Sequence, residues 1–231
     1  MAVCSICGKQ LKILPDAEVN VLLGMLEKSN CGALYQLYPH IFEYCPDCLI
    51  GDMSLTDSQV KLLKDRFDDR KKAYDNENFK DVDVFHWSRI AEIVAFSYEI
   101  IGCHREATLA YKASTDILDL MISSFISRNQ RITNHDSKEA VLRIEDFDNC
   151  KNALIYSKNL KRLTLGHLLK CLKGDDFVIF LIYFDTLIDL EQIDLCKTII
   201  NTLSKEKHPN KDYQDAIECL VNKFVHLNET C

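Results

Sequence analysis

The chain has few of the residues that make tight turns. Seven glycines and four prolines occur among its 231 residues, which leaves little turn chemistry for a large all-β fold and favours long helices. No apolar run reaches the ~18 residues needed to cross a bilayer. The N-terminus also lacks the basic-then-apolar pattern of a secretory signal. We therefore expect a mainly helical, cytoplasmic protein without a membrane-spanning segment.

Catalytic signatures are also missing. The sequence has no glycine-rich phosphate loop and no nucleophile elbow. His135 and Asp136 in ITNHDSKE resemble the paired ligands of all-helical HD phosphohydrolases, but such a pair needs a helix to aim both side chains, and this stretch is polar and loop-like. A metal-dependent phosphohydrolase is therefore the least favoured of three functional hypotheses, and we expect a protein that is not an enzyme.

Cysteine, in contrast, is abundant, with eleven in the chain. Four of them form two CxxC pairs, and two such pairs can surround one ion at ~2.3 Å, leaving no position for water or substrate. A thioredoxin-type dithiol is disfavoured because no βαβ pattern surrounds either pair. The spacing predicts a zinc-ribbon-like module over residues 1–55 with one structural Zn²⁺ ion. Its predicted ligands are Cys4, Cys7, Cys45 and Cys48.

The surroundings of the two pairs differ. Gly8 follows the first pair, where a backbone that wraps a sulfur atom often needs positive φ. Leu49 and Ile50 follow the second pair, so we expect its turn to be less regular. The 37 residues between the pairs exceed the usual ribbon spacing of ~15–20. Within them, VNVLLGMLEK fits either a strand or a short helix.

The remaining seven cysteines are expected to be thiols, because no secretory signal accompanies them. Four of them lie in or beside apolar-periodic segments, where a thiol packs as a small hydrophobic group: Cys150, Cys171, Cys196 and Cys219. Cys103 differs because it lies beside His104 and Arg105, and nearby cations lower a thiol pKa. A reactive Cys103 is therefore the alternative interpretation of this turn.

After residue 55 the sequence takes on a helical rhythm. Thr56 and Gln59 form a predicted capping box at the start of the first helix. Further on, an apolar stripe at spacings of four and three ends at Gly102, and a second stripe begins at Ala107. These stripes predict an antiparallel helical hairpin joined at GCHR. The first stripe contains Trp87, Ala91, Val94, Tyr98 and Ile101.

The hairpin AEIVAFSYEIIGCHREATLAYKAS resembles a tetratricopeptide repeat. Tyr98, Gly102, Ala107 and Tyr111 stand where that repeat has an aromatic residue, a turn glycine, a small residue and a second aromatic residue. Helical repeats bury their faces against neighbouring units. The resemblance therefore implies a tetratricopeptide-like antiparallel helical bundle over residues 56–231.

The layout as a whole resembles an uncharacterised bacterial family that joins an N-terminal CxxC…CxxC zinc module to a tetratricopeptide-like helical domain. The stretch YPHIFEYCPDC, an aromatic-rich approach to the second pair, carries this resemblance best. The lack of a glycine directly after Cys48 departs from the family pattern. The resemblance implies a fold and a metal but no activity.

Charge is segregated in the second half of the chain. No acidic residue occurs from Lys151 to Gly174, whereas Asp175 to Asp194 contains six acidic residues and no basic one. The simpler interpretation is that consecutive helices solvate and partly neutralise each other. The functional alternative is a basic docking patch for an acidic partner or for phosphates. Its candidate residues are Lys151, Lys158, Lys161, Arg162, Lys170 and Lys173.

Nucleic-acid binding is a natural hypothesis for a zinc-ribbon-like module. Residues 1–55, however, carry three lysines against six acidic residues, and the whole chain has a net charge of −7. Phosphate groups repel a net-negative module, and the chain lacks the basic footprint of a nucleic-acid binder. A nucleic-acid-associated zinc-ribbon protein that uses the 151–173 segment is therefore the second hypothesis.

The acidic stretch contains FVIFLIYFDTLIDL, in which 11 of 14 residues are apolar. It is too short to span a membrane, and its apolar residues continue a helical stripe. We expect a helix that is covered on most sides, either by the core of this chain or by a second subunit in a homodimer.

Together these observations favour a zinc-stabilised helical scaffold that binds another protein and performs no catalysis of its own. Helical hairpins expose side-chain-lined surfaces that suit peptides or helices. A closed metal site in the first segment would fix how that segment docks on the helices.

Overall fold

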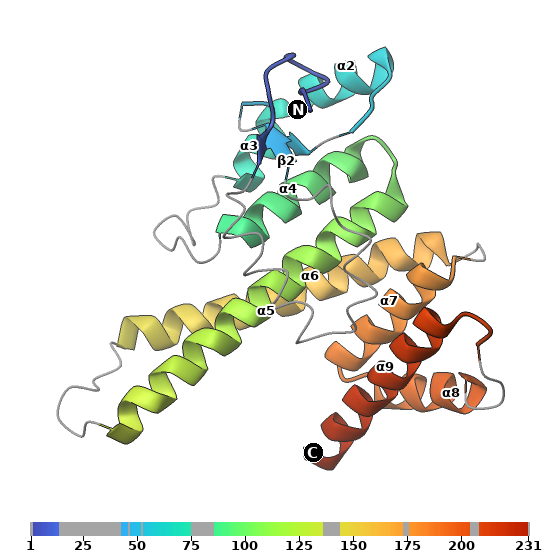
Figure 1. Ribbon diagram of the computed structural model, residues 1–231. Coiled ribbons are helices and arrows are strands. Elements are labelled where there is room, and N and C mark those ends of the chain that lie inside the picture. Colours follow the sequence, from blue (N-terminus) through green and yellow to red (C-terminus); the bar gives the residue numbers. More distant parts are fainter. Residues whose placement is uncertain are drawn as a thin grey trace.

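A computed structural model describes residues 2–13, 43–45, 47–51, 53–74, 86–135, 144–172, 176–203 and 208–230. Within these ranges the chain forms eight helices and three short strands, so the prediction of a mainly helical protein is confirmed. The strands lie at one end of the molecule, and the helices extend away from them (Figure 1). No helix of the described ranges combines the length and the apolar character needed to cross a bilayer.

The strands form one small antiparallel sheet in the order β1-β2-β3. They are β1 (Lys12–Ile13), β2 (Glu43–Cys45) and β3 (Ile50–Gly51). In the register, Lys12 is opposite Tyr44, and Cys45 is opposite Ile50. The sheet therefore brings the N-terminal segment beside the segment that carries the second CxxC pair. The stretch VNVLLGMLEK, residues 19–28, lies outside the described residues.

Two helices follow the sheet, α2 (Asp57–Asp65) and α3 (Phe67–Tyr74). The predicted capping box opens α2. The Thr56 backbone N–H donates to Oε1 of Gln59 at 3.0 Å, and the Gln59 backbone N–H donates to Oγ1 of Thr56 at 3.4 Å. These bonds satisfy donors that a helix start otherwise leaves unpaired.

The predicted hairpin consists of α4 (His86–Ile100) and α5 (His104–His135). Gly102 ends α4 with φ +77°. The Cys103 N–H donates to the Tyr98 carbonyl at 2.9 Å, and the Gly102 N–H donates to the Glu99 carbonyl at 3.0 Å. This is a Schellman cap, whose left-handed position favours glycine. The sequence prediction of a turn glycine at Gly102 is therefore confirmed.

Small side chains bring α4 and α5 together. Ala107 is fully buried and packs with Val94, Ala95 and Ala110 around the buried ring of Tyr111. Because a small residue at the contact lets two helices approach closely, Ala107 occupies the role that the sequence predicts for it.

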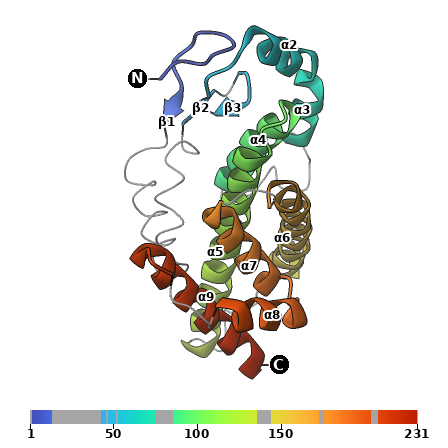
Figure 2. The ribbon, with the colours of Figure 1, turned by 90° about the vertical axis from the view of Figure 1, so that its right-hand side faces the viewer.

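The remaining helices are α6 (Ile144–Cys171), α7 (Phe177–Asp189), α8 (Ile193–Leu203) and α9 (Lys211–Thr230). Helix α6 packs along α5, and α7 contacts α6, α8 and α9. Figure 2 shows α7, α8 and α9 gathered at the end of the molecule opposite the sheet. Asp176 caps α7 by accepting hydrogen bonds from the N–H groups of Val178 and Ile179 at 3.1 and 3.3 Å.

The apolar 177–190 segment is helix α7 and belongs to the core of this chain. Ile182 and Phe184 are fully buried, and the largest hydrophobic cluster joins α7 to residues of α4, α5, α6, α8 and α9. The sequence left open whether the chain's own core or a second subunit covers this helix. The chain's own helices cover it. A second subunit is not needed to shield α7 from water.

We predict that Ala107→Leu destabilises the fold by about 1–3 kcal/mol, because the larger side chain has no space between α4 and α5. Thermal unfolding measures the effect. The control is Ser123→Leu, which adds the same side chain at an exposed position of α5. Equal melting temperatures for the two variants would contradict the close approach of α4 and α5 at Ala107.

Candidate metal centre

The first CxxC pair forms a tight turn around a sulfur atom. The Gly8 N–H donates to the Cys4 carbonyl at 2.8 Å, and the Ile6 N–H lies 3.4 Å from Sγ of Cys4. Gly8 has φ +70°, as its position after the pair predicts. Backbone N–H groups directed at a sulfur stabilise the thiolate that a metal requires.

The second pair repeats this geometry. The Leu49 N–H donates to the Cys45 carbonyl at 2.8 Å, and the Cys48 N–H lies 3.4 Å from Sγ of Cys45. Leu49 takes φ +55°, a conformation that disfavours side chains with a Cβ. The expectation of a less regular second turn is therefore wrong. Leu49 is buried, and this burial offsets the backbone strain.

The two turns bring four sulfur atoms together. Ligand atoms of Cys4, Cys7, Cys45 and Cys48 all lie within 4.8 Å of one another, so the group could hold a metal ion. The Cys7 and Cys45 sulfurs are 3.7 Å apart. A tetrahedral ion with sulfur ligands at about 2.3 Å separates them by about 3.8 Å, whereas a disulfide requires about 2.05 Å. The donor set therefore fits a tetrahedral metal ion.

The surroundings shift the pKa values of three of these thiols in different directions. A hydrogen bond from the Lys9 backbone lowers the pKa of Cys7 to about 7, whereas burial raises the pKa values of Cys45 and Cys48. The two buried thiols alone would hold their protons at neutral pH. A cation at the centre reverses this preference, because it stabilises every thiolate around it. Deprotonation of the whole set is thus linked to metal binding.

The cysteine cluster also forms part of a hydrophobic core. Cys4, Cys45 and Cys48 pack with Leu63 of α2 and against Tyr98 of α4. The hydroxyl of Ser97 on α4 donates to the Leu49 carbonyl at 3.0 Å. The second turn is therefore attached directly to the α4–α5 hairpin.

Further contacts hold the two turns to each other. Ser5 donates from its hydroxyl to the Met53 carbonyl at 2.5 Å, and the Lys9 ammonium pairs with Asp47 at 2.6 Å. The Lys9 pair is exposed and so contributes little. The apolar contacts around the four cysteines carry most of the connection.

We predict that the full chain binds one metal ion and that Cys45→Ser abolishes stoichiometric binding, because a hydroxyl is a poor replacement for a buried thiolate ligand. Elemental analysis of the purified protein measures the content. Cys219→Ser, at an exposed position of α9, is the matched control and retains the metal. Full occupancy in Cys45→Ser would contradict the assignment.

Comparisons of the chain with protein-family models, with curated proteins and with solved structures found no match. The resemblance to an uncharacterised bacterial family therefore stays a prediction.

A second charged group lies in the helical core. The Lys112 ammonium is 2.5 Å from Oδ1 of Asp116 and also pairs with Asp185. Lys223 of α9 lies 2.5 Å from Asp185 and 2.6 Å from Asp189. Burial would raise the pKa of Asp185, but Lys112 and Lys223 lower it below the usual range. These ion pairs join α5, α7 and α9; Lys112, Asp116 and Asp185 are buried, and Lys223 is partly exposed.

Sequence reasoning did not identify this network, although two signals pointed to it. Lys112 and Asp116 are an i,i+4 pair on the apolar stripe of α5, and Asp185 and Asp189 interrupt the apolar run of α7. Oxygen atoms of Asp116, Asp185 and Asp189 lie close enough to hold a metal ion. Lys112 already supplies the positive charge that these carboxylates need, so the group is an internal ion-pair network.

The network predicts a pH dependence of stability. Burial, opposed by Lys112 and reinforced by Asp185 and Asp189, raises the pKa of Asp116 to about 6, above the ~3.9 of an unfolded chain. The stability from this raised pKa is present below pH ~4 and is lost as the pH rises through about 6.

Asp116→Asn cannot ionise at this position. We therefore expect its free energy of unfolding to rise, relative to that of the wild type, by roughly 2 kcal/mol between pH 4 and pH 7. Denaturant unfolding at several pH values measures the difference. Asp194→Asn, at an exposed position of α8, serves as the control. If the difference in free energy of unfolding between Asp116→Asn and the wild type stayed constant with pH, the raised pKa of Asp116 would be contradicted.

The predicted basic patch lies on α6, but not all of its members share one environment. Lys151, Lys158, Arg162 and Lys170 are exposed. Lys161 instead points inward, with its ammonium 2.5 Å from Asp119 and 3.7 Å from Asp189, so it belongs to the internal ion pairs. Lys173 lies outside the described residues. The exposed patch is thus smaller than the sequence predicts.

His167 does not contribute to this surface either. It is buried, its ring stacks on Tyr111 with centroids 5.4 Å apart, and its Nε2 atom lies 3.4 Å from Glu99. Burial, opposed by Glu99, lowers its pKa. His167 therefore links α6 to α4 and α5 as a packed, neutral side chain at physiological pH.

The cysteines outside the two CxxC pairs and His135 differ in their surroundings. Burial raises the pKa of Cys103, which is the opposite of what a reactive thiol requires. Cys196 is buried as predicted, whereas Cys219 is exposed and Cys171 is half-buried, so the core prediction is wrong for Cys219. His135 is the last residue of α5, so the expectation that it lies in a loop is wrong.

Two of these candidates remain untested. Asp136, the partner of His135 in the phosphohydrolase hypothesis, lies outside the described residues, as does the side chain of Cys150. The hypothesis of a metal-dependent phosphohydrolase therefore gains no support from the described part of the chain.

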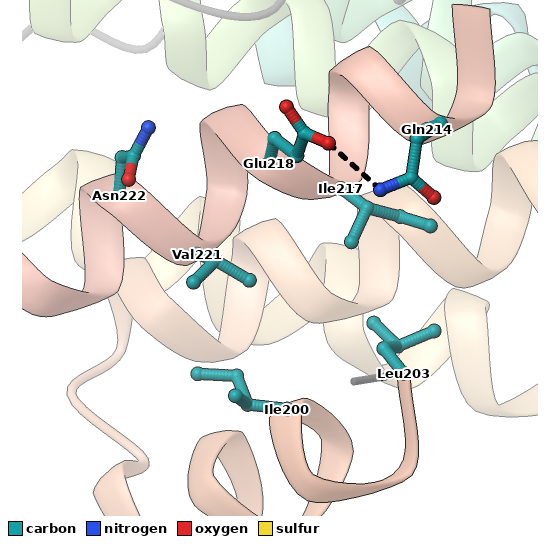
Figure 3. Close-up of a pocket in the computed structure, with 7 residues that line it drawn as sticks. All are labelled: Ile200, Leu203, Gln214, Ile217, Glu218, Val221 and Asn222. Atoms are coloured by element: carbon teal, nitrogen blue, oxygen red, sulfur yellow. Dashed lines mark hydrogen bonds between the residues drawn. The ribbon is translucent and has the colours of Figure 1, made fainter. Parts of the chain in front are cut away.

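A hollow of about 280 Å³ lies between α8 and α9. Figure 3 shows Ile200 and Leu203 of α8 facing Ile217 and Val221 of α9 across it. Its outer rim is polar, with the Gln214 side-chain amide donating to Glu218 at 2.9 Å. None of the residues that line the hollow belongs to either of the two groups that could hold a metal ion in the described part of the chain.

Proposed function

We propose that this protein is a zinc-stabilised helical scaffold that binds another protein and has no catalytic activity of its own. Four thiolates in a tetrahedral arrangement suit zinc, and with all four positions taken by protein the ion has no place for a substrate. The role of the ion is then to hold the N-terminal segment as a zinc-ribbon-like module against α4.

The hairpin of α4 and α5 supports the scaffold proposal. Its Schellman cap at Gly102 and its buried Ala107 fit the tetratricopeptide-like arrangement, in which helical pairs present their surfaces to peptides or helices. Helix α6 packs against α5 of this hairpin, and α7 packs against α6.

The observation that carries the proposal is the outward surface of α6. Four of the eight large hydrophobic residues exposed in the described part of the chain lie on this one helix: Leu154, Ile155, Leu163 and Leu169. Helical spacing places Ile155 and Leu169 on one side of α6, with Leu154 and Leu163 to either side of them. Exposed apolar side chains on one helix are typical of a protein interaction site. The hollow between α8 and α9 adds a second, smaller apolar surface.

The second candidate function is nucleic-acid binding through the same helix. It is favoured by the exposed basic residues Lys151, Lys158, Arg162 and Lys170. The net charge of −7 opposes it, because phosphate binding requires a basic footprint. The exposed aliphatic residues also offer no aromatic platform on which bases can stack.

We predict that the full chain, purified from its native host, retains a protein partner and no nucleic acid. The measurements are mass spectrometry of the retained proteins and the A260/A280 ratio. The variant Ile155→Asp/Leu169→Asp, which changes two exposed side chains, should lose the partner and keep its fold by circular dichroism. Thr198→Asp/Thr202→Asp, exposed on α8, is the control. The proposal would be contradicted if the purified protein retained nucleic acid, or if it retained no protein whose binding is lost in the α6 variant.

A further inference from the structure

The outward surface of α6 forms a continuous line along the helix. Its residues follow at spacings of three and four, so they lie above one another on one side: Lys151, Ile155, Lys158, Arg162, Gly166 and Leu169. We call this line the α6 face. In Figure 2, α6 runs along one edge of the helical assembly. Its opposite side packs on α5 and α7.

The α6 face combines apolar and basic side chains. Ile155 and Leu169 are 54% and 56% exposed. Lys151, Lys158 and Arg162 form no ion pair within the described part of the chain, and Arg162 donates a hydrogen bond to the side chain of Asn159 at 3.3 Å. No acidic residue occurs anywhere from 151 to 170. A binding partner must therefore supply both apolar side chains and negative charge.

Gly166 is the third feature of the α6 face. It lies inside the helix, where glycine is less favourable than alanine because it gains backbone freedom on unfolding. A Cβ atom added at Gly166 would meet no atom within 4 Å. Packing within the described part of the chain therefore gives no reason for a glycine. Missing side chains on a helix surface allow the backbone of a second helix to approach closely.

We propose that the α6 face binds an amphipathic helix of a partner protein, in which acidic residues flank an apolar strip, with closest approach at Gly166. This inference rests on the proposed scaffold function and specifies the partner's chemistry. The partner's carboxylates pair with Lys158 and Arg162, and its apolar strip covers Ile155 and Leu169. The recess at Gly166 sets the register of the two helices.

Other occupants fit the α6 face less well. A second copy of this chain, packed face to face, would place two basic lines against each other, and like charges at a contact oppose association. An anionic membrane attracts basic amphipathic helices, but it has no backbone that needs a recess at Gly166. Single-stranded nucleic acid would leave Ile155 and Leu169 without stacked bases.

Photo-crosslinking from a position beside the α6 face tests the proposal. A photoreactive amino acid replaces Asn159, which is exposed and uncharged, in the full chain. Host lysate is irradiated, and the crosslinked segment is sequenced by mass spectrometry. We expect a protein segment whose apolar residues recur at helical spacing and whose flanking residues are mainly Asp and Glu. A basic or neutral segment, a lipid, a nucleic acid or no crosslink would overturn the proposal.

Two variants separate this surface from general effects on folding. Lys158→Glu/Arg162→Glu should reduce the crosslink yield at least tenfold. The control, Lys197→Glu/Lys211→Glu, reverses two exposed charges on α8 and α9 and leaves the yield unchanged. Equal losses in both would show that the face has no special role.

The variant Gly166→Ala gives the sharpest test. It should raise the melting temperature by about 1–4 °C, because alanine suits a helix better, and yet lower the crosslink yield about tenfold. A stabilised variant with unchanged yield would overturn the close approach at Gly166. If the α6-dependent partner of the scaffold proposal is still retained in that case, only this inference fails.

Discussion

The convergence of four thiols on one point is the constraint on which the N-terminal part of the structure depends. The described residues of this part form only two-residue and three-residue strands, which are too short to be stable by pairing alone. A structural metal bound by thiolates typically contributes ~10–16 kcal/mol, more than the whole stability of many domains. The Ser97 hydroxyl and the apolar contacts to Tyr98 then transmit this fixed geometry to the α4–α5 hairpin.

The helical part is held by different means. Its core combines the apolar residues of α7 with a buried group of ion pairs around Lys112, Asp185 and Lys223. Such pairs contribute little more to stability than apolar side chains of similar volume would. Removing one partner, however, leaves an unpaired charge in the core, which is strongly destabilising. They therefore specify how α5, α7 and α9 meet. Among the described residues, the exposed basic side chains of α6 form no ion pair with these inward carboxylates.

Much of this structure follows from local sequence patterns. The capping box at Thr56, the cap at Gly102 and the small residue at Ala107 each depend on a few neighbouring residues, and each lies where the sequence predicts. Long-range relations were harder to predict. The sequence shows Lys161 among other basic residues, and only the packing of α6 on α5 and α7 turns its ammonium inward. Leu49 shows the same limit, because tertiary contacts hold a leucine where local preference favours glycine.

The central claim is that one tetrahedral zinc ion joins the two CxxC turns. X-ray absorption spectroscopy at the zinc edge on the purified full chain tests it most directly, because it reports the element, the ligand type and the bond length together. The account predicts four sulfur ligands at about 2.3 Å and no nitrogen or oxygen ligand. A first coordination sphere that contains nitrogen or oxygen, or the absence of zinc from protein with all four cysteines reduced, would contradict it.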